Sequence, residues 1–240
     1  MSSPKQMMDF KPVKSVDANV SNEHQRNWSK EFFEQKAKNP DHNYDRSRTA
    51  LNFQVGPGGR ITEIDESRRI GDKVDEIIKK HLRPNARVTA ISNRAVMVVF
   101  GGNRERMREM AFGSQELNEY GESNGHLIRQ PEIEQWAKDV YGFVCREFGE
   151  ENIASFIVHL DETGPHAHCV FVPLTADGRL SSKVVLGGKN KIEARQHMRD
   201  LHTRLAEVNR KYGLDRGDNI QVTGARHRST AEYNRDLHRE

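Results

Sequence analysis

Three histidines and two carboxylates lie within a ten-residue segment of this chain, in the order His-Leu-Asp-Glu-Thr-Gly-Pro-His-Ala-His from His159 to His168. Imidazole nitrogens bind divalent transition ions, and three of them on one ion leave positions open for a substrate. The spacing does not fit zinc proteases, which place two histidines on one helix as His-Glu-x-x-His. The segment therefore predicts a divalent metal site formed by His159, His166 and His168.

The residues around this segment indicate how the histidines come together. Segments 153–158 and 169–173 are apolar and partly β-branched, as strands are, and residues 161–165 are of types common in turns. Together they predict a β-hairpin. Residues two apart in a strand point to the same face, so the two histidines of the second strand lie side by side. His159 joins them from the first strand, whereas Cys169 points to the opposite face and packs in the core.

The carboxylates of the segment have chemistry of their own. Glu162 is the first candidate to orient a ligand histidine or to act as a base toward a nucleophile, and Asp161 is the second. Each also has a simpler interpretation as a turn residue. Neutral imidazole ligands favour Mn²⁺ or another transition ion, with Mg²⁺ as the second choice because it prefers oxygen ligands.

Length and composition limit the class of protein. A chain of 240 residues forms one domain or two small ones, and its two tryptophans and ten phenylalanines are enough for a core. No run approaches the ~18–20 apolar residues of a membrane span, and the first residues lack the apolar centre of a secretory signal. Cys145 and Cys169 are far apart and give no disulfide framework. We therefore expect a cytoplasmic protein.

The charge of the chain is unevenly distributed. The net charge is +3, but residues 179–240 contain 14 Lys/Arg and 8 Asp/Glu, a net of +6, which leaves −3 for the rest. A basic segment directly after the histidines indicates a polyanionic partner, most often nucleic acid. The alternative is that these charges belong to ordinary solvated helices.

Hydrophobic periodicity predicts an α+β domain with a central antiparallel sheet, helices packed over one face and the metal hairpin near the middle. An edge strand is expected around Pro12, because proline within a strand is tolerated at an edge. The other elements predicted are a helix over 23–37, a strand over 50–55, a turn over 56–59, a helix over 62–82, a strand over 88–100, and helices over 131–148, 191–212 and 230–240.

Three sequence blocks resemble the plasmid mobilisation relaxases of the Pre/Mob (MobV) family, which belong to the HUH endonucleases. The specific one is 159–168, followed by Val-Phe-Val-Pro at 170–173 and by Asp-Gly-Arg-Leu-Ser-Ser-Lys at 177–183. The HUH pattern has a hydrophobic residue between its two histidines, and Ala167 at this position is a mild departure from the pattern. Segments 45–53 and 225–233 resemble two further blocks of the family, in the family order.

The resemblance implies an HUH relaxase-like fold and a DNA strand transferase. Such an enzyme nicks one strand at the transfer origin of a plasmid or mobile element, stays covalently attached to the 5′ phosphate and starts conjugative mobilisation. The expected partners are single-stranded or supercoiled origin DNA, a coupling protein and accessory mobilisation proteins, in the bacterial cytoplasm. Residues 1–240 are expected to be the relaxase domain, as an N-terminal fragment of a longer protein.

The resemblance also implies a nucleophile, a histidine in a His-Asn-x-Arg motif near the N-terminus. The best match here is Asn-Glu-His-Gln-Arg at 22–26, in which Gln25 replaces the asparagine and the arginine comes one residue early. His24 is therefore the first candidate, and Arg26 is expected to stabilise the charge of the phosphate. Tyr44 is the second candidate, because other HUH enzymes use tyrosine.

DNA contacts are expected from basic and amide side chains, and base stacking from Trp28 or Tyr233. Three other functions remain open: an HUH replication initiator or transposase, a metal-dependent hydrolase of a small molecule, and a non-catalytic DNA-binding module. The residues expected to bind DNA are Arg46, Arg48, Asn52, Lys183, Lys189, Lys191, Arg226 and Arg228.

Overall fold

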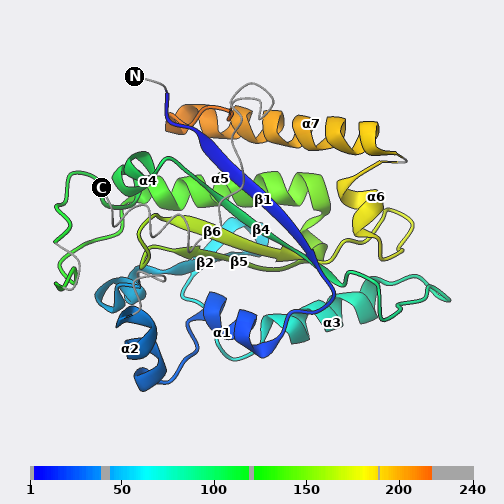
Figure 1. The fold of residues 1–240 in the computed structure, drawn as a ribbon, viewed down its shortest axis with the longest axis horizontal. Coiled ribbons are helices and arrows are strands. Elements are labelled where there is room, and N and C mark those ends of the chain that lie inside the picture. Colours follow the sequence, from blue (N-terminus) through cyan, green and yellow to red (C-terminus); the bar gives the residue numbers. More distant parts are fainter. Residues whose placement is uncertain (1–2, 39–43, 119–121, 189, 218–240) are drawn as a thin grey trace.

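The computed structural model describes residues 3–38, 44–118, 122–188 and 190–217. In this part of the chain six strands form one sheet with the order β1-β4-β6-β5-β2-β3 (Figure 1). All neighbouring strands are antiparallel, so the predicted α+β fold with a central antiparallel sheet is confirmed. The strands are β1 (Gln6–Val13), β2 (Phe53–Gly56), β3 (Arg60–Thr62), β4 (Ala95–Gly102), β5 (Ile153–His159) and β6 (His166–Phe171).

The two central strands, β5 and β6, form the hairpin that the histidine segment predicted. His159 lies directly opposite His166 in the register. Strands β2 and β4 pair with the outer sides of this hairpin, so it is held on both flanks. Strand β1 lies at the edge of the sheet, in agreement with the expectation from Pro12.

Helices α5 (Pro131–Phe148) and α7 (Lys191–Asn209) cover one face of the sheet and form the larger core with it. A proline in the first turn of α5 needs no hydrogen-bond partner for its nitrogen, and Gly149 ends the helix with a φ of 83°. Trp136 is fully buried in this core. Cys169 is fully buried there as well, so its predicted packing role is confirmed.

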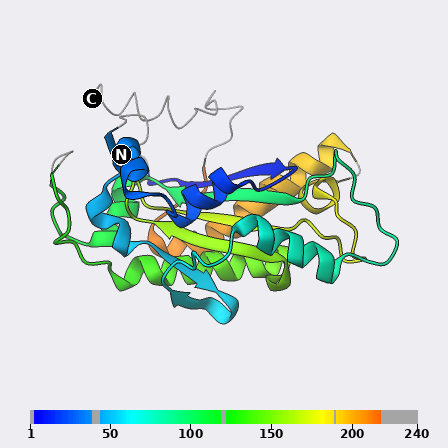
Figure 2. The same ribbon diagram turned by 90° about the horizontal axis from the view of Figure 1, so that it is seen from below.

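The opposite face carries α1 (Ala18–Gln25) and α3 (Ile70–His81), and Figure 2 shows α1 and α5 on different sides of the strands. A second, smaller core packs Val74 of α3 against Ile157 and Val170 of the hairpin. The expectation of helices over one face is therefore wrong. Both faces of the central strands are apolar, and each needs a cover. The remaining helices are α2 (Lys30–Lys38), α4 (Arg104–Phe112) and α6 (Ser182–Leu186), with short 3₁₀ turns at Arg46–Leu51, Pro57–Gly59, Glu150–Asn152 and Arg210–Tyr212.

The helix expected over 23–37 is wrong, because the chain breaks between α1 and α2. Arg26 adopts a left-handed conformation with a φ of 56° and closes α1 with backbone hydrogen bonds to the carbonyl groups of Asn22 and Glu23. The helix expected over 62–82 begins only at Ile70, whereas the helix over 131–148 has the predicted bounds.

Some elements of the structure differ from those expected from the sequence, and one expected helix falls on residues that the structure does not describe. Helix α6 and strand β3 were not predicted. The strand expected over 50–55 begins only at Phe53, after a 3₁₀ turn that ends at Leu51. The helix expected over 230–240 lies outside the described residues. None of the described helices is both long enough and apolar enough to cross a membrane.

Candidate metal centre and reaction site

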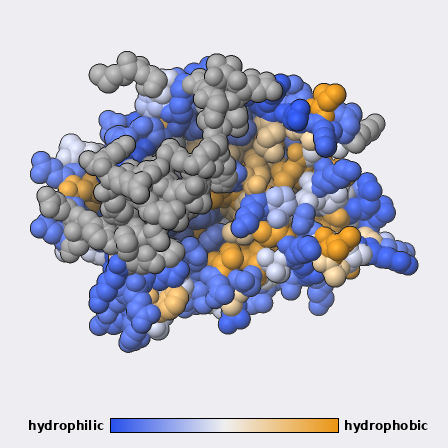
Figure 3. Space-filling model, in the orientation of Figure 1, coloured by the Kyte–Doolittle hydropathy of each residue, from blue (hydrophilic) through white to orange (hydrophobic). Residues whose placement is uncertain are grey.

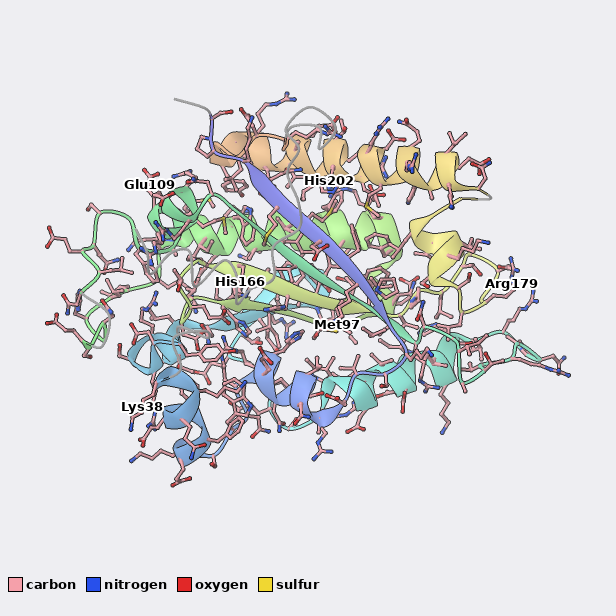
Figure 4. All side chains as sticks on the ribbon, viewed as in Figure 1. Lys38, Met97, Glu109, His166, Arg179 and His202 are labelled. Carbon is pink, nitrogen blue, oxygen red and sulfur yellow. The ribbon has the colours of Figure 1, made fainter. Side chains whose placement is uncertain are left out.

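Alternation along the hairpin directs three histidines to the face that α1 covers. On β6, Ala167 and Cys169 point into the larger core, so His166 and His168 point the other way. His159 pairs with His166 across the hairpin and lies on the same face. Figure 4 shows His166 over the central part of the sheet.

One nitrogen from each of these histidines and a carboxylate oxygen of Glu162 lie within 4.8 Å of one another. The Nε2 atoms of His166 and His168 are 2.9 Å apart. Glu162 Oε1 lies 3.5 Å from His159 Nδ1 and 3.9 Å from His166 Nε2. The predicted trio of imidazoles therefore converges. Glu162, expected only to orient a ligand or to act as a base, also lies among the donor atoms.

In His159 and in His166, a hydrogen bond to a backbone carbonyl group determines which ring nitrogen keeps a lone pair. His159 Nε2 lies 2.7 Å from the carbonyl oxygen of His24, and His166 Nδ1 lies 2.8 Å from that of Gly164. A carbonyl oxygen only accepts, so these nitrogens carry the hydrogens, and His159 Nδ1 and His166 Nε2 are left as acceptors. His159 Nδ1 is buried without a hydrogen-bond partner, which is costly unless another group satisfies it. A coordinated divalent ion would do so, and the donor set therefore fits a metal.

His24, at the last turn of α1, stacks on this group although it is 135 residues away from His159 in the sequence. Its ring lies 4.2 Å from that of His168 between centroids, with 28° between the planes. Burial, followed by the charges of His159 and Arg26, lowers the pKa of His24 from 6.5 to about 3. The imidazole is therefore neutral near pH 7.

Gln25 fixes the end of α1 to the segment that leads into α3. Its Nε2 donates to the carbonyl oxygens of Asp65 and Arg68 at 2.6 and 2.8 Å, in the segment that leads into α3. The glutamine is 2 % exposed. This residue, which stands in place of the asparagine of the family motif, therefore anchors the helix that carries His24.

Arg26 joins the end of α1 to the turn between β5 and β6. Its Nε and Nη2 donate to the two carboxylate oxygens of Asp161 at 3.0 and 2.8 Å, and Nη2 also donates to Glu162 Oε1 at 2.5 Å. The side chain is 2 % exposed. The sequence assigned this guanidinium to the phosphate, but here its paired donors are occupied by Asp161, so Arg26 has a different placement from the one expected.

The two carboxylates of the turn therefore differ in their contacts. Asp161 is fully buried and accepts from Arg26 and, at 3.2 Å, from Thr49 Oγ1. Burial by itself would raise the pKa of Asp161, but the charge and hydrogen bonds of Arg26 hold it below its usual value. Burial would likewise raise the pKa of Glu162, but His166, His159 and Arg26 lower it. No local sequence pattern links Asp161 to Arg26, because the two positions are 135 residues apart.

Tyr44, the second candidate nucleophile, is 5 % exposed and donates from its hydroxyl to Glu23 Oε1 at 3.1 Å. The guanidinium carbon of Arg26 lies 4.5 Å from the centroid of its ring. Burial, and then the carboxylates of Glu162 and Glu23, raise the pKa of Tyr44. Its phenolate is disfavoured, whereas His24 is already in its neutral form.

Two residues expected to contact DNA are buried instead. Arg48 is 4 % exposed and donates to Asp45 Oδ2 at 2.8 Å and to the carbonyl oxygen of Glu162 at 3.2 Å. Asn52 is 6 % exposed and accepts from the backbone N–H of Leu160 at 2.7 Å. Both side chains support the turn that carries the histidines, so the expected contacts with DNA are not available to them in this arrangement.

The other expected DNA contacts are spread over the molecule. Arg46 is exposed and pairs with Glu34 at 2.8 Å. Lys183 and Lys191 are exposed on α6 and α7, beyond the end of β6 opposite to His166 (Figures 1 and 4). The structure does not bring these two lysines to the histidines. Lys189, Arg226, Arg228 and Tyr233 lie outside the described residues.

Comparisons with known proteins support one family. A family model described as plasmid recombination enzyme (Mob_Pre) matches residues 128–235, which include the histidine segment. Plasmid recombination enzyme type 1 of Staphylococcus aureus is 44 % identical over 107 residues, which cover 44 % of this chain and 25 % of that protein. The type 3 enzyme of Mammaliicoccus lentus is 39 % identical over 99 residues, 41 % of this chain and 22 % of that protein. The matches thus span about a quarter of the length of these relatives, and the resemblance predicted from the histidine segment is confirmed.

Solved structures share the fold at low sequence identity. The MobM relaxase domain (MOBV; Mob_Pre), bound to plasmid pMV158 oriT DNA and manganese, superposes with a TM-score of 0.69 at 19 % identity. That match covers 96 % of this chain and 99 % of the MobM chain. A second MobM structure, with a longer oriT strand of 26 nucleotides, gives a TM-score of 0.59 at 17 % identity. The described chain therefore has the α+β fold of this relaxase domain.

Proposed function

Because this chain is similar to the Pre/Mob plasmid recombination enzymes in sequence and to the MobM relaxase domain in fold, we propose that it is a metal-dependent DNA relaxase. It nicks one strand at the transfer origin of a plasmid or mobile element and keeps the 5′ phosphate on the protein. The observation that carries the proposal is the neutral ring of His24 stacked on the group formed by His159, His166 and His168. A hydrolase of a small molecule would form no covalent adduct with DNA, so the adduct assay below separates the two functions.

The metal site has four donors. His159 Nδ1, His166 Nε2, a nitrogen of His168 and an oxygen of Glu162 would hold the ion. When bound, a divalent ion withdraws charge from a phosphate oxygen and so makes the phosphorus easier to attack. Mn²⁺ is the proposed ion because nitrogen donors predominate and because the MobM structures contain manganese; Mg²⁺ is the second choice.

His24 is the proposed nucleophile. A lone pair of its ring attacks phosphorus in line, a P–N bond forms, and the P–O bond to the 3′ oxygen breaks. The 3′ oxygen leaves with the electron pair and takes up a proton, while the other ring nitrogen of His24 releases one. The phosphoramidate keeps the bond energy, so the 3′ end can reverse the reaction and religate without water.

Arg26 and Asp161 are proposed as positioning residues. Their paired hydrogen bonds fasten the end of α1 to the turn before β6, and the contact of Arg26 with Glu162 holds that carboxylate beside the histidines. Breaking such a buried pair on one side leaves an uncompensated charge, which is strongly destabilising. Both residues therefore act on the alignment of His24 and Glu162, not on the phosphate directly.

The partner proposed for this site is single-stranded or supercoiled DNA at a transfer origin. The MobM domain is bound to oriT DNA in the structures that share this fold, which supports the class of ligand. As a relaxase in the bacterial cytoplasm, the protein would also interact with a coupling protein and with accessory mobilisation proteins.

A covalent adduct is the decisive test. The protein is mixed with single strands that carry the origin of its own plasmid or element, with Mn²⁺ or with EDTA, and run on a denaturing gel. We expect a slower-migrating adduct with Mn²⁺ and none with EDTA, and we expect His24→Ala to abolish it while Tyr44→Phe retains it. Acid lability of the adduct identifies a phosphohistidine. Loss of the adduct in Tyr44→Phe with retention in His24→Ala would reverse the assignment.

The same assay separates the other candidate functions. Retained binding of the strand without cleavage in Mn²⁺ would indicate a non-catalytic DNA-binding module. An adduct that forms on a replication origin or a transposon end, and not on a transfer origin, would indicate an HUH replication initiator or transposase. Both alternatives keep the fold and the donor group and change only the DNA or the chemistry.

A further inference from the structure

An aromatic and basic surface lies on α2 and on the turn before it, beside the reaction site. Phe32 and Lys36 are four residues apart in α2 and therefore lie on one side of the helix. Trp28 lies in the segment just before α2. Phe32 is 44 % exposed, which is unusual for so large an apolar ring, and Trp28 and Lys36 are half-buried. Figure 3 shows apolar surface at the place of α2, lower left, with hydrophilic surface around it.

The three side chains contact one another. The rings of Trp28 and Phe32 meet edge to face with 5.7 Å between centroids. Lys36 Nζ lies 5.5 Å from the Trp28 ring and 5.7 Å from the Phe32 ring. Phe33 is the residue that fastens α2, since it is 5 % exposed and packs on Trp28 and Tyr44. Packing therefore does not explain why Phe32 faces the solvent.

Arg26 joins this surface to the reaction site. The guanidinium carbon of Arg26 lies 5.6 Å from the Trp28 ring, and the same guanidinium donates to Glu162 at 2.5 Å. Trp28 also follows His24 by four residues, across the break between α1 and α2. A strand whose phosphate is attacked at His24 has its neighbouring nucleotides within reach of this surface.

We propose that Trp28, Phe32 and Lys36 form a stacking site for unpaired bases next to the scissile phosphate. The location of that phosphate rests on the proposed function. Aromatic rings stack on any base, and a lysine beside them contacts the backbone phosphate. The occupant is a single strand, because the bases of a duplex are stacked on each other and offer no face to these rings.

Intrinsic fluorescence reads this site directly. The chain has two tryptophans, and Trp136 is fully buried with its Nε1 donating to Asn209, so it is shielded from a ligand. The probe is a single-stranded oligothymidylate, titrated into the protein in EDTA so that no cleavage occurs. A strand of equal length in which every base is replaced by an abasic site has the same phosphates without bases.

We expect oligothymidylate to quench the fluorescence and to bind about ten- to a hundredfold more weakly to Phe32→Ala, the usual effect of one lost stacking partner. Phe32→Tyr keeps the aromatic face and should bind like the wild type. Ile192→Ala removes an even more exposed apolar side chain from α7 and should have no effect. The abasic strand should leave the fluorescence unchanged, and Trp28→Phe should lose the signal.

Equal affinity of wild type and Phe32→Ala for oligothymidylate, or equal quenching by the abasic strand, would overturn the stacking site. The adduct assay is independent of this result. A protein that forms the adduct with Mn²⁺ but shows no base-dependent quenching retains the proposed function and lacks the stacking site. Base-dependent quenching without any adduct leaves a stacking site on a protein that is not a relaxase.

Discussion

At the scale of single residues, the proposed chemistry depends on histidines that stay neutral. Burial is the largest cause of the lowered pKa of His24, His159 and His168, and the nearby charge of Arg26 acts in the same direction. A neutral ring has one lone pair, which is what a metal ligand or a nucleophile needs. The carbonyl groups that accept from His159 and His166 then decide which nitrogen carries that lone pair.

The lowered pKa values predict how stability changes with pH. In the metal-free protein the folded state takes up a proton on His24 only near pH 3, whereas the unfolded state does so near 6.5. The free energy of unfolding therefore falls as the pH decreases below 6.5, by about 2 kcal/mol between pH 7 and 5 for one such group. Denaturant unfolding of the protein in EDTA at a series of pH values between 7 and 5 measures this decrease in the free energy of unfolding.

The matched variant for this prediction is His24→Gln, which removes one of the three buried imidazoles with a lowered pKa. Its free energy of unfolding should fall less steeply with decreasing pH than that of the wild type. His159 and His168 remain in the variant, and their lowered pKa values leave a residual slope of the same sign. Parallel curves for the two proteins would show that His24 takes up its proton at an ordinary pH.

At the scale of elements, the position of His24 is determined by α1 and by how closely α3 approaches it. Gln25 and Arg26 fasten the end of α1 on two sides, to the segment before α3 and to the turn before β6. At the other end, the first turn of α3 lies against the carbonyl group of Val16, where Gly71 leaves room for it. The α3 helix thus supports the face on which the candidate nucleophile rests.

Gly71→Ala is expected to disturb this support. A methyl group at position 71 would overlap the carbonyl oxygen of Val16, a backbone atom that has to move. We expect a loss of about 1–3 kcal/mol in the free energy of unfolding, as for other overpacked sites, and slower adduct formation. Gly142→Ala in α5 is the control, because its nearest neighbour is the end of Arg146 at 3.5 Å, and it should be neutral or slightly stabilising. Wild-type stability of Gly71→Ala would refute the close approach.

The sequence predicted these elements unevenly, and the reasons are physical. The hairpin and α5 were found because alternation and a helical stripe are local patterns. The break at Arg26 was missed because arginine rarely adopts a positive φ, and the contacts that hold it there come from Asp161 and Glu162. The same long-range contacts make Arg26 a support and not a free phosphate contact, which no local pattern reveals.

At the scale of the whole molecule, one polar group ties together elements that are far apart in the chain. Asn209 of α7 accepts from Trp136 Nε1 at 3.0 Å and donates to Gln6 Oε1 at 2.9 Å, and Gln6 Nε2 donates to the carbonyl oxygen of His202 at 2.8 Å. The group thus fastens β1, α5 and α7 on the face of the sheet opposite to the histidines. This group therefore stabilises the fold from the face of the sheet that does not carry the reaction site.

Asn209→Ala tests this separation. It leaves the buried indole N–H of Trp136 and the side-chain oxygen of Gln6 without the partner that Asn209 supplied, which costs about 2–4 kcal/mol in the free energy of unfolding for two such groups. The rate of adduct formation per folded molecule should stay unchanged at temperatures where the variant is folded. Gln196→Ala, on the exposed side of α7, should change neither quantity. A slower reaction of folded Asn209→Ala would mean that the two faces are coupled.

The hydrogen bond from His159 to the backbone of His24 has a thermodynamic corollary. Because of this bond, the orientation of the His159 ring, a candidate metal ligand, is linked to the position of His24, the candidate nucleophile. Coupling of this kind is reciprocal. If a bound strand restrains His24 and so raises the affinity for the cation, the bound cation raises the affinity for the strand by the same factor. Through this single N–H···O contact, binding of the strand and binding of the cation would each strengthen the other.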